Sequence, residues 1–267
     1  MVGGPTEGDR VHAVRTPAQL FDLTGRTAII TGSSRGIGLG LAHGFAAAGA
    51  RVVISSRKAE ACEKAAAEVI AEGGEAIAVP AHAGNLDDIA RLVSSTLDAF
   101  SGIDIVVNNA ATSLAQPLGE MTPEAWQKVQ DANLRGPLFL IQEALPALRK
   151  SEHASVINVV TAGVFLASAN VAMYAAAKTA LLSLTRSMAS QYAKDGIRVN
   201  ALAPGAVDTD MTRGTGEAGM EGMRNASAQK RIATVEEMVG PALLLASDAG
   251  SFITGEVLVA DGGLCYH

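Results

Sequence analysis

The chain has 267 residues, which suits one large α/β domain or two small ones and is ample for a complete hydrophobic core. Hydrophobic residues make up 48% of the sequence and charged residues 18%, proportions that exclude an intrinsically disordered chain. The formal net charge of −6 argues against nucleic acid or an anionic membrane surface as a partner, because both select basic patches.

The spacing of the cysteines and the lengths of the apolar runs indicate the cellular compartment in which we expect this protein. Cys62 and Cys265 are far apart and form no Cys-x-x-Cys or Cys/His cluster, so we expect neither a disulfide framework nor a metal site. A reducing compartment, the cytoplasm, is the simplest expectation. Apolar runs stop well before a membrane-spanning length. Residues 1–20 begin Gly-rich and charged, which predicts a flexible N-terminal extension, with a targeting segment as the alternative.

From residue 26 onward, short β-branched runs alternate with longer alanine-rich amphipathic stretches. The short runs predict strands at 27–31, 51–55, 75–79, 103–107, 155–159, 197–201 and 257–259. The longer stretches predict helices at 36–48, 58–72, 86–100, 123–149, 172–194 and 235–247. Nearly continuous apolar strands are typical of a parallel sheet covered on both faces. We therefore predict a single α/β domain over residues 21–267, a Rossmann-like doubly wound parallel sheet with helices on both faces.

The segment around residues 210–229 departs from this alternation. It is polar, rich in glycine and methionine, and poorly periodic. These properties predict a mobile loop or lid. Apolar side chains in and before this segment predict either a flexible apolar substrate pocket or ordinary core packing: Val164, Phe165, Leu166, Met173, Met211, Met220 and Met223.

A glycine-rich turn follows the first predicted strand. It reads Thr31-Gly-Ser-Ser-Arg-Gly-Ile-Gly38 and leads into the first long helix. Glycines permit a tight turn and let backbone N–H groups approach a pyrophosphate at the start of a helix. A glycine-rich turn alone is a weak signal, but its place between a strand and a helix favours dinucleotide binding over a merely structural turn.

The end of the second predicted strand indicates which dinucleotide binds. An acidic residue there would hydrogen-bond the adenosine ribose and repel a 2′-phosphate. The sequence reads Ser55-Ser56-Arg57-Lys58 instead, and arginine suits bidentate contact with phosphate. Arg35 in the glycine-rich turn is a second candidate cation. We predict NADP(H) over NAD(H); the alternative is a solvated charge pair at a helix start, with NAD(H) still possible.

Tyr174 and Lys178 are the candidates for acid–base chemistry. They are four residues apart in a predicted helix and therefore share one face. A nearby ammonium group stabilises phenolate and lowers the pKa of a tyrosine from its usual value of about 10. A tyrosine tuned in this way donates a proton to a carbonyl oxygen, or accepts one from an alcohol. Because this spacing is common by chance, the pair needs support from the rest of the sequence.

Motifs spread from about residue 21 to the end resemble those of the short-chain dehydrogenase/reductase family. The resemblance rests on Thr31 to Gly38, Asn108-Asn109-Ala110, Asn133, Tyr174-x-x-x-Lys178, Arg198-Val-Asn200, Pro204-Gly205, Ile253-Thr-Gly255 and Asp261-Gly-Gly263. All of them occur in the family's order and approximate spacing, so the set is specific. The resemblance implies the doubly wound fold, a dinucleotide cofactor and oxidoreductase chemistry.

The resemblance also implies roles for individual residues. It makes Tyr174 the general acid/base, and Lys178 the residue that binds the nicotinamide ribose hydroxyls and lowers the pKa of Tyr174. It makes Asn133 the residue that positions a water linking Lys178 to bulk solvent. Together with the turns described above, it predicts a cofactor site of Gly32, Ser34, Arg35, Gly36, Ile37, Gly38, Ser56, Arg57, His82, Ala83, Asn109, Ala110, Tyr174, Lys178, Pro204, Gly205, Val207 and Thr209.

Three positions depart from the family's usual pattern. Thr161 stands where a serine usually precedes the tyrosine by thirteen residues, and its hydroxyl lets us predict a hydrogen bond to the substrate oxygen. Ser155 and Ser168 fit that position less well. Ala111 replaces a glycine, which we expect to be tolerated. His82 replaces an aspartate that contacts adenine; it either forms a hydrogen bond there or is an ordinary loop residue whose neighbour's backbone lies near the adenine.

These inferences predict an enzyme that transfers hydride between NADP(H) and a ketone or secondary alcohol, with carbonyl or 3-oxoacyl-thioester reduction favoured. The alternatives are a sugar or polyol dehydrogenase and, in a different class, a dinucleotide-binding sensor without turnover. The catalytic residues would be Asn133, Thr161, Tyr174 and Lys178. The resemblance further implies a homotetramer or homodimer packed through the helices predicted at 123–149 and 172–194.

Overall fold

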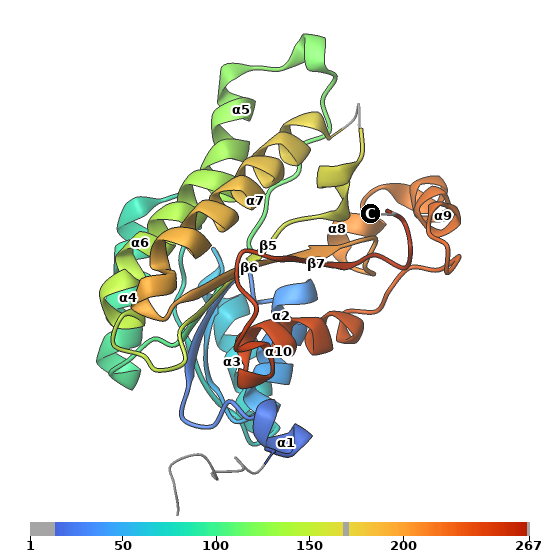
Figure 1. Ribbon diagram of the computed structural model, residues 1–267. Coiled ribbons are helices and arrows are strands. Elements are labelled where there is room, and N and C mark those ends of the chain that lie inside the picture. Colours follow the sequence, from blue (N-terminus) through green and yellow to red (C-terminus); the bar gives the residue numbers. More distant parts are fainter. Residues whose placement is uncertain (1–13, 168–170, 266–267) are drawn as a thin grey trace, which may run out of the picture.

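The computed structural model describes residues 14–167 and 171–265. In this part of the chain the strands form one seven-stranded parallel sheet in the order β3-β2-β1-β4-β5-β6-β7 (Figure 1). The order reverses between β1 and β4, the place where open α/β sheets bind ligands. The strands are β1 Thr27–Thr31, β2 Arg51–Ser55, β3 Glu75–Ala78, β4 Ile105–Asn108, β5 Ser155–Val159, β6 Arg198–Pro204 and β7 Val257–Ala260.

Helices cover both faces of this sheet (Figure 1). The helices α2, α3 and α10 pack on one face, and α4, α6 and α7 pack on the other. The α-helices are α1 Pro17–Leu20, α2 Gly36–Ala47, α3 Ala59–Ala71, α4 Leu86–Phe100, α5 Pro123–Gln130, α6 Gly136–Leu148, α7 Ala172–Tyr192, α8 Asp210–Arg213, α9 Gly216–Ala226 and α10 Val239–Ala246. Short 3₁₀ turns are η1 Leu118–Glu120, η3 Ala162–Phe165, η4 Ala193–Asp195, η5 Glu236–Met238 and η6 Asp248–Gly250. The predicted fold class is confirmed.

The central strand β1 shows why its sequence is apolar throughout. Ala28 and Ile30 belong to the core under α2, α3 and α10, whereas Ile29 belongs to the core under α4, α6 and α7. All three side chains are completely buried. Because successive side chains of a strand point to opposite faces, a strand covered on both sides needs apolar residues at every position.

The single helix predicted over residues 123–149 is interrupted. A π-helical turn, η2 (Asp131–Arg135), separates α5 from α6, and the N–H of Gly136 donates to the carbonyl five residues back. Pro137 follows at once and has no N–H, so it cannot donate the ordinary α-helical bond to the carbonyl of Asn133. Turns of this kind occur frequently at functional sites. This one contains the predicted relay residue.

Two segments predicted to be irregular contain helices. The segment 210–229 holds α8 and α9, although no residue of α9 is buried. In the predicted extension, Thr16 caps α1, and Arg15 forms an ion pair with Asp248 at 2.7 Å. Residues 1–13 of that extension lie outside the described residues. Among the helices that the structure describes, none has both the length and the apolar character needed to cross a bilayer.

Candidate active site

The predicted site residues gather at one edge of the sheet, where β1 to β6 end. The glycine-rich turn follows β1, and the loops after the next five strands carry most of the remaining candidates. Tyr174 and Lys178 lie in the first two turns of α7, and Asn133 lies in η2. The loop residues are Ser56 and Arg57 after β2, His82 and Ala83 after β3, Asn109 and Ala110 after β4, Thr161 after β5, and Gly205, Val207 and Thr209 after β6, which ends with Pro204.

The glycines of the turn after β1 are required by close backbone packing. A Cβ atom on Gly38 would lie 2.5 Å from both the side-chain nitrogen of Asn109 and the carbonyl oxygen of Gly32. Gly32 and Gly36 have φ angles of +68° and +57°, which disfavour other residues. Arg35, the residue before α2, makes no side-chain cap, so the first N–H groups of this helix are available to an anion.

Hydroxyl groups tie this turn to the neighbouring strands. The hydroxyl oxygen of Thr31 accepts hydrogen bonds from the backbone N–H groups of Asn109 and Ala110, both at 3.1 Å. The hydroxyl of Ser33 accepts one from the N–H of Ser55 at 2.9 Å. The turn is thus held against the ends of β2 and β4. Sequence reasoning assigned no function to Thr31 and Ser33; the signal was a buried hydroxyl beside an otherwise apolar strand.

The loop after β2 carries the hydroxyl of Ser56 and the guanidinium of Arg57, and the turn after β1 carries Arg35. The backbone N–H of Ser56 donates to the sulfur of Cys62 at 3.1 Å, and this cysteine is completely buried. Arg57 is exposed. Arg35 is also exposed and forms an ion pair with Asp210, the first residue of α8, at 2.9 Å. The buried thiol therefore orients Ser56, while both guanidinium groups remain accessible to a phosphate.

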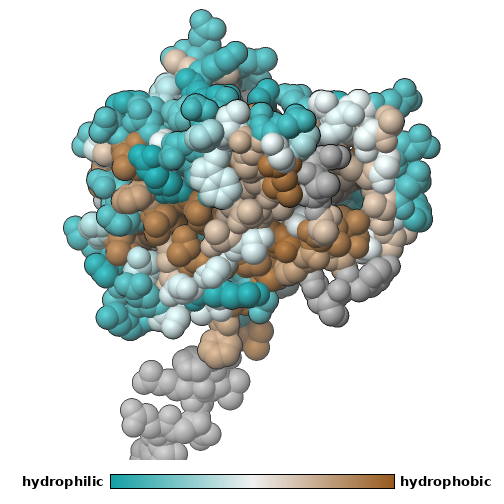
Figure 2. All heavy atoms as spheres, turned by 90° about the horizontal axis from the view of Figure 1, so that it is seen from above, coloured by the Kyte–Doolittle hydropathy of each residue, from teal (hydrophilic) through white to brown (hydrophobic). Residues whose placement is uncertain are grey.

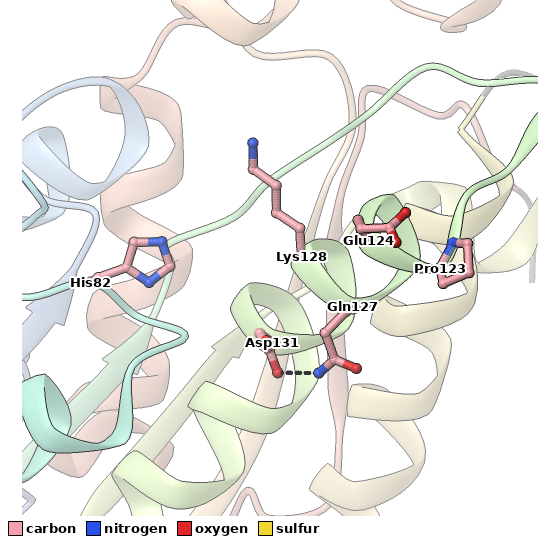
Figure 3. Close-up of a pocket in the computed structure, with 6 residues that line it drawn as sticks. All are labelled: His82, Pro123, Glu124, Gln127, Lys128 and Asp131. Atoms are coloured by element: carbon pink, nitrogen blue, oxygen red, sulfur yellow. Dashed lines mark hydrogen bonds between the residues drawn. The ribbon is translucent and has the colours of Figure 1, made fainter.

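His82, after β3, has a fixed orientation. Its backbone N–H donates to Asp88 at 2.8 Å, and its Nδ1 accepts from the N–H of Gly84 at 3.0 Å. The hydrogen of a neutral ring therefore lies on Nε2. Figure 3 shows the ring facing α5 across a hollow of about 590 Å³. The residues that line this hollow are His82, Pro123, Glu124, Gln127, Lys128 and Asp131.

Tyr174 and Lys178 lie side by side on α7, where Lys178 is buried and Tyr174 is partly exposed. The ammonium nitrogen of Lys178 lies 5.9 Å from the centroid of the Tyr174 ring and donates to the carbonyl of Val159 at 2.7 Å. Burial lowers the pKa of Lys178 to about 7 and raises the pKa of Tyr174 to about 12. The predicted lowering of the tyrosine pKa is not found, because desolvation of the phenolate dominates and a lysine with this pKa is only partly charged near neutral pH.

Thr161 lies two residues after the buried end of β5 and caps the start of η3. Its hydroxyl oxygen accepts a hydrogen bond from the N–H of Gly163 at 3.1 Å, which leaves its own O–H free to donate. Ser155 is completely buried, and its hydroxyl donates to the carbonyl of Leu245 at 2.8 Å, away from this edge of the sheet. Ser168, the other alternative, lies outside the described residues.

The side chain of Asn133 is committed to supporting the loop after β4. Its amide nitrogen donates to the carbonyls of Thr112 and Val129, both at 2.8 Å, and its amide oxygen accepts from the N–H of Thr112 at 3.2 Å. The residue is completely buried. Its backbone carbonyl does not accept the usual α-helical bond from residue 137, because Pro137 has no N–H.

The chain matches known proteins over nearly all of its length. The family model described as enoyl-(acyl carrier protein) reductase matches residues 32–265. A 3-oxoacyl-[acyl-carrier-protein] reductase from Synechocystis is 38% identical, with 91% of this chain and 98% of the relative covered. Dehydrogenase/reductase SDR family member 4 from Oryctolagus cuniculus is 36% identical, with 90% and 94% covered. The chain belongs to the short-chain dehydrogenase/reductase family.

A solved structure agrees with this assignment. A putative NAD(P)-dependent gluconate 5-dehydrogenase from Beutenbergia cavernae, with bound NADP, superposes with a TM-score of 0.87 at 37% identity, covering 92% of this chain and 98% of that chain. Our protein is therefore an oxidoreductase of the short-chain family, as the motifs predicted.

One buried network in this short-chain dehydrogenase/reductase joins two strands to the helix that carries Tyr174. The amide nitrogen of Asn108 donates to the side-chain oxygen of Asn158 at 2.9 Å, and the amide nitrogen of Asn158 donates to the hydroxyl of Thr185 at 2.8 Å. The three residues are buried and connect β4, β5 and α7. In the sequence, the signal for this network is an asparagine inside the apolar run of β5. The network fixes α7, and with it Tyr174, against the sheet.

The predicted apolar pocket residues of this family member divide into two groups. Met173 is 2% exposed and packs with Val129 and Ala177, so it belongs to the core. Phe165, Leu166 and Met211 expose 37%, 44% and 50% of their surface. Figure 2 looks down on the molecule from above and shows hydrophobic residues in a band across the visible face, with hydrophilic residues along its margins.

Proposed function

We propose that this short-chain dehydrogenase/reductase reduces a ketone or a 3-oxoacyl thioester with NADPH, and oxidises the corresponding secondary alcohol in reverse. The observation that carries the proposal is the contact between Tyr174 and the buried Lys178 on α7, at the same edge of the sheet as the glycine-rich turn. The 3-oxoacyl-[acyl-carrier-protein] reductase of Synechocystis, at 38% identity, supports this substrate class.

The backbone around the glycine-rich turn fits a dinucleotide. Side chains at Gly32 and Gly38 would collide with neighbouring backbone or amide atoms, so this cradle suits close approach of a pyrophosphate to the start of α2. Arg35, Ser56 and Arg57 would hold the 2′-phosphate. The remaining predicted contacts are His82 and Ala83 at the adenine, and Asn109, Ala110, Pro204, Gly205, Val207 and Thr209 toward the nicotinamide. When bound, NADPH supplies the hydride that reduces the carbonyl carbon.

The protein's own groups manage the substrate oxygen and its proton. The Tyr174 hydroxyl donates its proton to that oxygen, and the free O–H of Thr161 donates a hydrogen bond to it. Lys178, whose pKa of about 7 lets it exchange protons at neutral pH, lies beside Tyr174. The carbonyl of Asn133 would accept a hydrogen bond from a water that connects this lysine to solvent. Lys178 would also bind the ribose hydroxyls.

A second candidate substrate class is a keto-sugar acid or polyol. The structural similarity to the putative gluconate 5-dehydrogenase of Beutenbergia cavernae, at 37% identity, favours it. A sensor without turnover is disfavoured because tyrosine, lysine, asparagine and threonine are all present in the arrangement described above. A homotetramer or homodimer packed through α5, α6 and α7, and a cytoplasmic location, remain predictions.

A substrate panel tests the proposal. Purified protein is mixed with NADPH or NADH and a set of simple ketones, an acetoacetyl thioester and a keto-sugar acid, and loss of reduced-cofactor absorbance is followed. Tyr174→Phe should lower turnover by about 1000-fold, because a positioned acid contributes rates of this order, yet change NADPH affinity by no more than about threefold. Substantial turnover in the variant, or NADPH binding without turnover of any panel member, would contradict the proposal.

A further inference from the structure

Gln116 carries a polar group that the protein itself does not satisfy. It lies in the loop between β4 and η1, and its side-chain oxygen is buried without a hydrogen-bond partner among the described residues. Its amide nitrogen also forms no hydrogen bond with them. Leaving a buried amide oxygen unpaired is unfavourable for folding, so a protein that keeps such a group usually has another use for it.

The loop that contains Gln116 packs against the start of the helix that carries the proposed acid. Thr112 is bound to the side chain of Asn133 in η2 through two hydrogen bonds. Leu114 packs with the buried cluster that contains Met173, the residue before Tyr174. Gln116 follows two residues later. The loop therefore runs from the π-turn to the first turn of α7, which carries the proposed acid.

The position distinguishes Gln116 from the other unpaired groups. Within the described residues, the other buried side-chain atoms without a partner are Thr27 Oγ1, Arg51 Nε and Ser247 Oγ. Thr27 and Arg51 begin β1 and β2, and the backbone carbonyl of Ser247 accepts from Arg198, which begins β6. All three belong to the amino end of the sheet, opposite the site. Gln116 alone in this set belongs to the carboxyl end, where substrates bind.

We propose that Gln116 is a specificity-determining residue that hydrogen-bonds a hydroxyl or amide group of the substrate, several atoms from the carbonyl that is reduced. This rests on the proposed function. A glutamine amide both accepts and donates hydrogen bonds. It can therefore pair with a hydroxyl or a secondary amide, but it forms no hydrogen bond with an alkyl group. Exposed Leu118 and Leu166 lie in η1 and just after η3, the elements next to this loop and to Thr161, so the substrate would also carry an apolar part. A hydroxyketone and an acyl thioester with an amide-containing arm share this chemistry.

Two matched pairs of substrates test the proposal. One pair tests recognition of a hydroxyl group, and the other tests recognition of an amide group. 5-Hydroxypentan-2-one and hexan-2-one have the same size and differ in one hydroxyl, three carbons from the carbonyl; acetoacetyl-N-acetylcysteamine and ethyl acetoacetate differ in the thioester arm that carries an amide. Wild-type enzyme should favour the donor-bearing member of at least one pair by about tenfold in kcat/KM, the effect of one hydrogen bond at a site built to form it. Gln116→Met, which keeps the length and removes the amide, should bring that pair within about twofold by lowering only the favoured member.

The control and the stability readout separate recognition from a structural role. Gln127→Met makes the same change on α5 and should keep the substrate preference. Gln116→Met should leave the unfolding temperature unchanged or raised, because it removes an unpaired buried polar atom, whereas loss of a structural contact would lower it. An unchanged substrate preference in Gln116→Met, or equal wild-type rates within both pairs, would overturn the inference about Gln116 but not the proposed function. Failure of wild-type enzyme to reduce any of the four compounds or the wider panel would overturn the proposed function itself.

Discussion

The dinucleotide side and the substrate side of the same sheet edge are built in different ways. On the dinucleotide side, Thr31 and Ser33 bind the turn after β1 to its neighbours, and a single added carbon at Gly38 would collide with two atoms. On the substrate side, α9 has no buried residue and Gln116 has an unpaired buried oxygen among the described residues.

This difference follows what each side has to bind. A dinucleotide presents the same pyrophosphate to every enzyme that uses it, so a rigid backbone cradle is sufficient. The relatives are named for different substrates, a 3-oxoacyl-[acyl-carrier-protein] in one and, for a putative enzyme, gluconate in another, so the segments proposed to meet the substrate need not be rigid. Segments with few buried contacts open at lower free energy than the core, and binding sites that must move are drawn from them.

Gly38→Ala is the most damaging change expected on the rigid side. The new Cβ atom would lie 2.5 Å from two fixed atoms, so NADPH affinity should fall by about 100-fold, the equivalent of about 2.7 kcal/mol of overpacking. Fluorescence titration of NADPH measures this. Gly102→Ala is the matched control, because a Cβ there meets no atom within 4 Å. If Gly38→Ala binds NADPH as tightly as wild type, the backbone around the glycine-rich turn must be able to shift. The contrast between a rigid dinucleotide side and a mobile substrate side would then be wrong.

Thr161→Val tests the substrate side at the reacting oxygen. The variant keeps the shape and removes the free O–H, so kcat/KM should fall by about 100-fold, as for loss of one donor to a developing oxyanion. Thr161→Ser keeps the donor and should retain activity. NADPH affinity should be unchanged in both variants. Unaltered turnover in Thr161→Val would remove this residue from the catalytic set.

Arg57→Ala tests the cation at the end of β2. Loss of a charged hydrogen bond to the 2′-phosphate should raise the KM for NADPH by about tenfold and leave the KM for NADH unchanged. Comparison of the two constants in wild type and variant measures the effect. If wild-type enzyme prefers NADH, or if the variant loses affinity for both cofactors equally, the assignment of Arg57 is wrong.

A pH dependence of stability is expected from Lys178. Its folded pKa of about 7 is below the unfolded value of about 10.4, so between these values the unfolded state binds more protons and stability rises with pH. Tyr174 keeps its proton throughout this window, because its pKa is about 12. From about pH 7 to about pH 9, the unfolding free energy should rise by up to about 2 kcal/mol more in wild type than in Lys178→Met. Urea denaturation of both proteins measures the difference, and parallel curves would contradict the burial of a titrating lysine.

The strands and the Tyr174–Lys178 pair could be predicted from the sequence, because each follows a local pattern of residues. The limits of β1 and β2 were predicted to the residue, since apolar runs covered on both faces end abruptly at polar turns. The predicted strand at 103–107 begins two residues late, at Ile105, because Asp104 uses its carboxylate to accept from the N–H of Thr27. Tyr174 and Lys178 came from a motif with fixed spacing.

Other features depend on information that local patterns do not contain. Glycines at 216, 219 and 222 made α9 look irregular, although glutamate, alanine and methionine between them favour a helix. The direction of the Tyr174 pKa shift depends on burial, which only the packed structure provides. Gln116 belongs to no motif, and its unpaired oxygen becomes visible only when every neighbouring donor has been placed.

The π-turn at Asp131–Arg135 has a consequence for which length changes this fold tolerates. Such a turn contains one residue more than a regular helical turn. The wider turn absorbs this residue locally, so α6 keeps the orientation in which Leu140, Ile141 and Ala144 fill the core between α4 and the sheet. Removing a residue from the turn would not make the helix regular, because Pro137 still has no N–H to donate. A deletion at the start of α6 itself would rotate the following side chains by about 100°, the angle between successive residues of an α-helix, and take them out of this core. Length changes in α6 should thus be far more damaging than length changes confined to the π-turn.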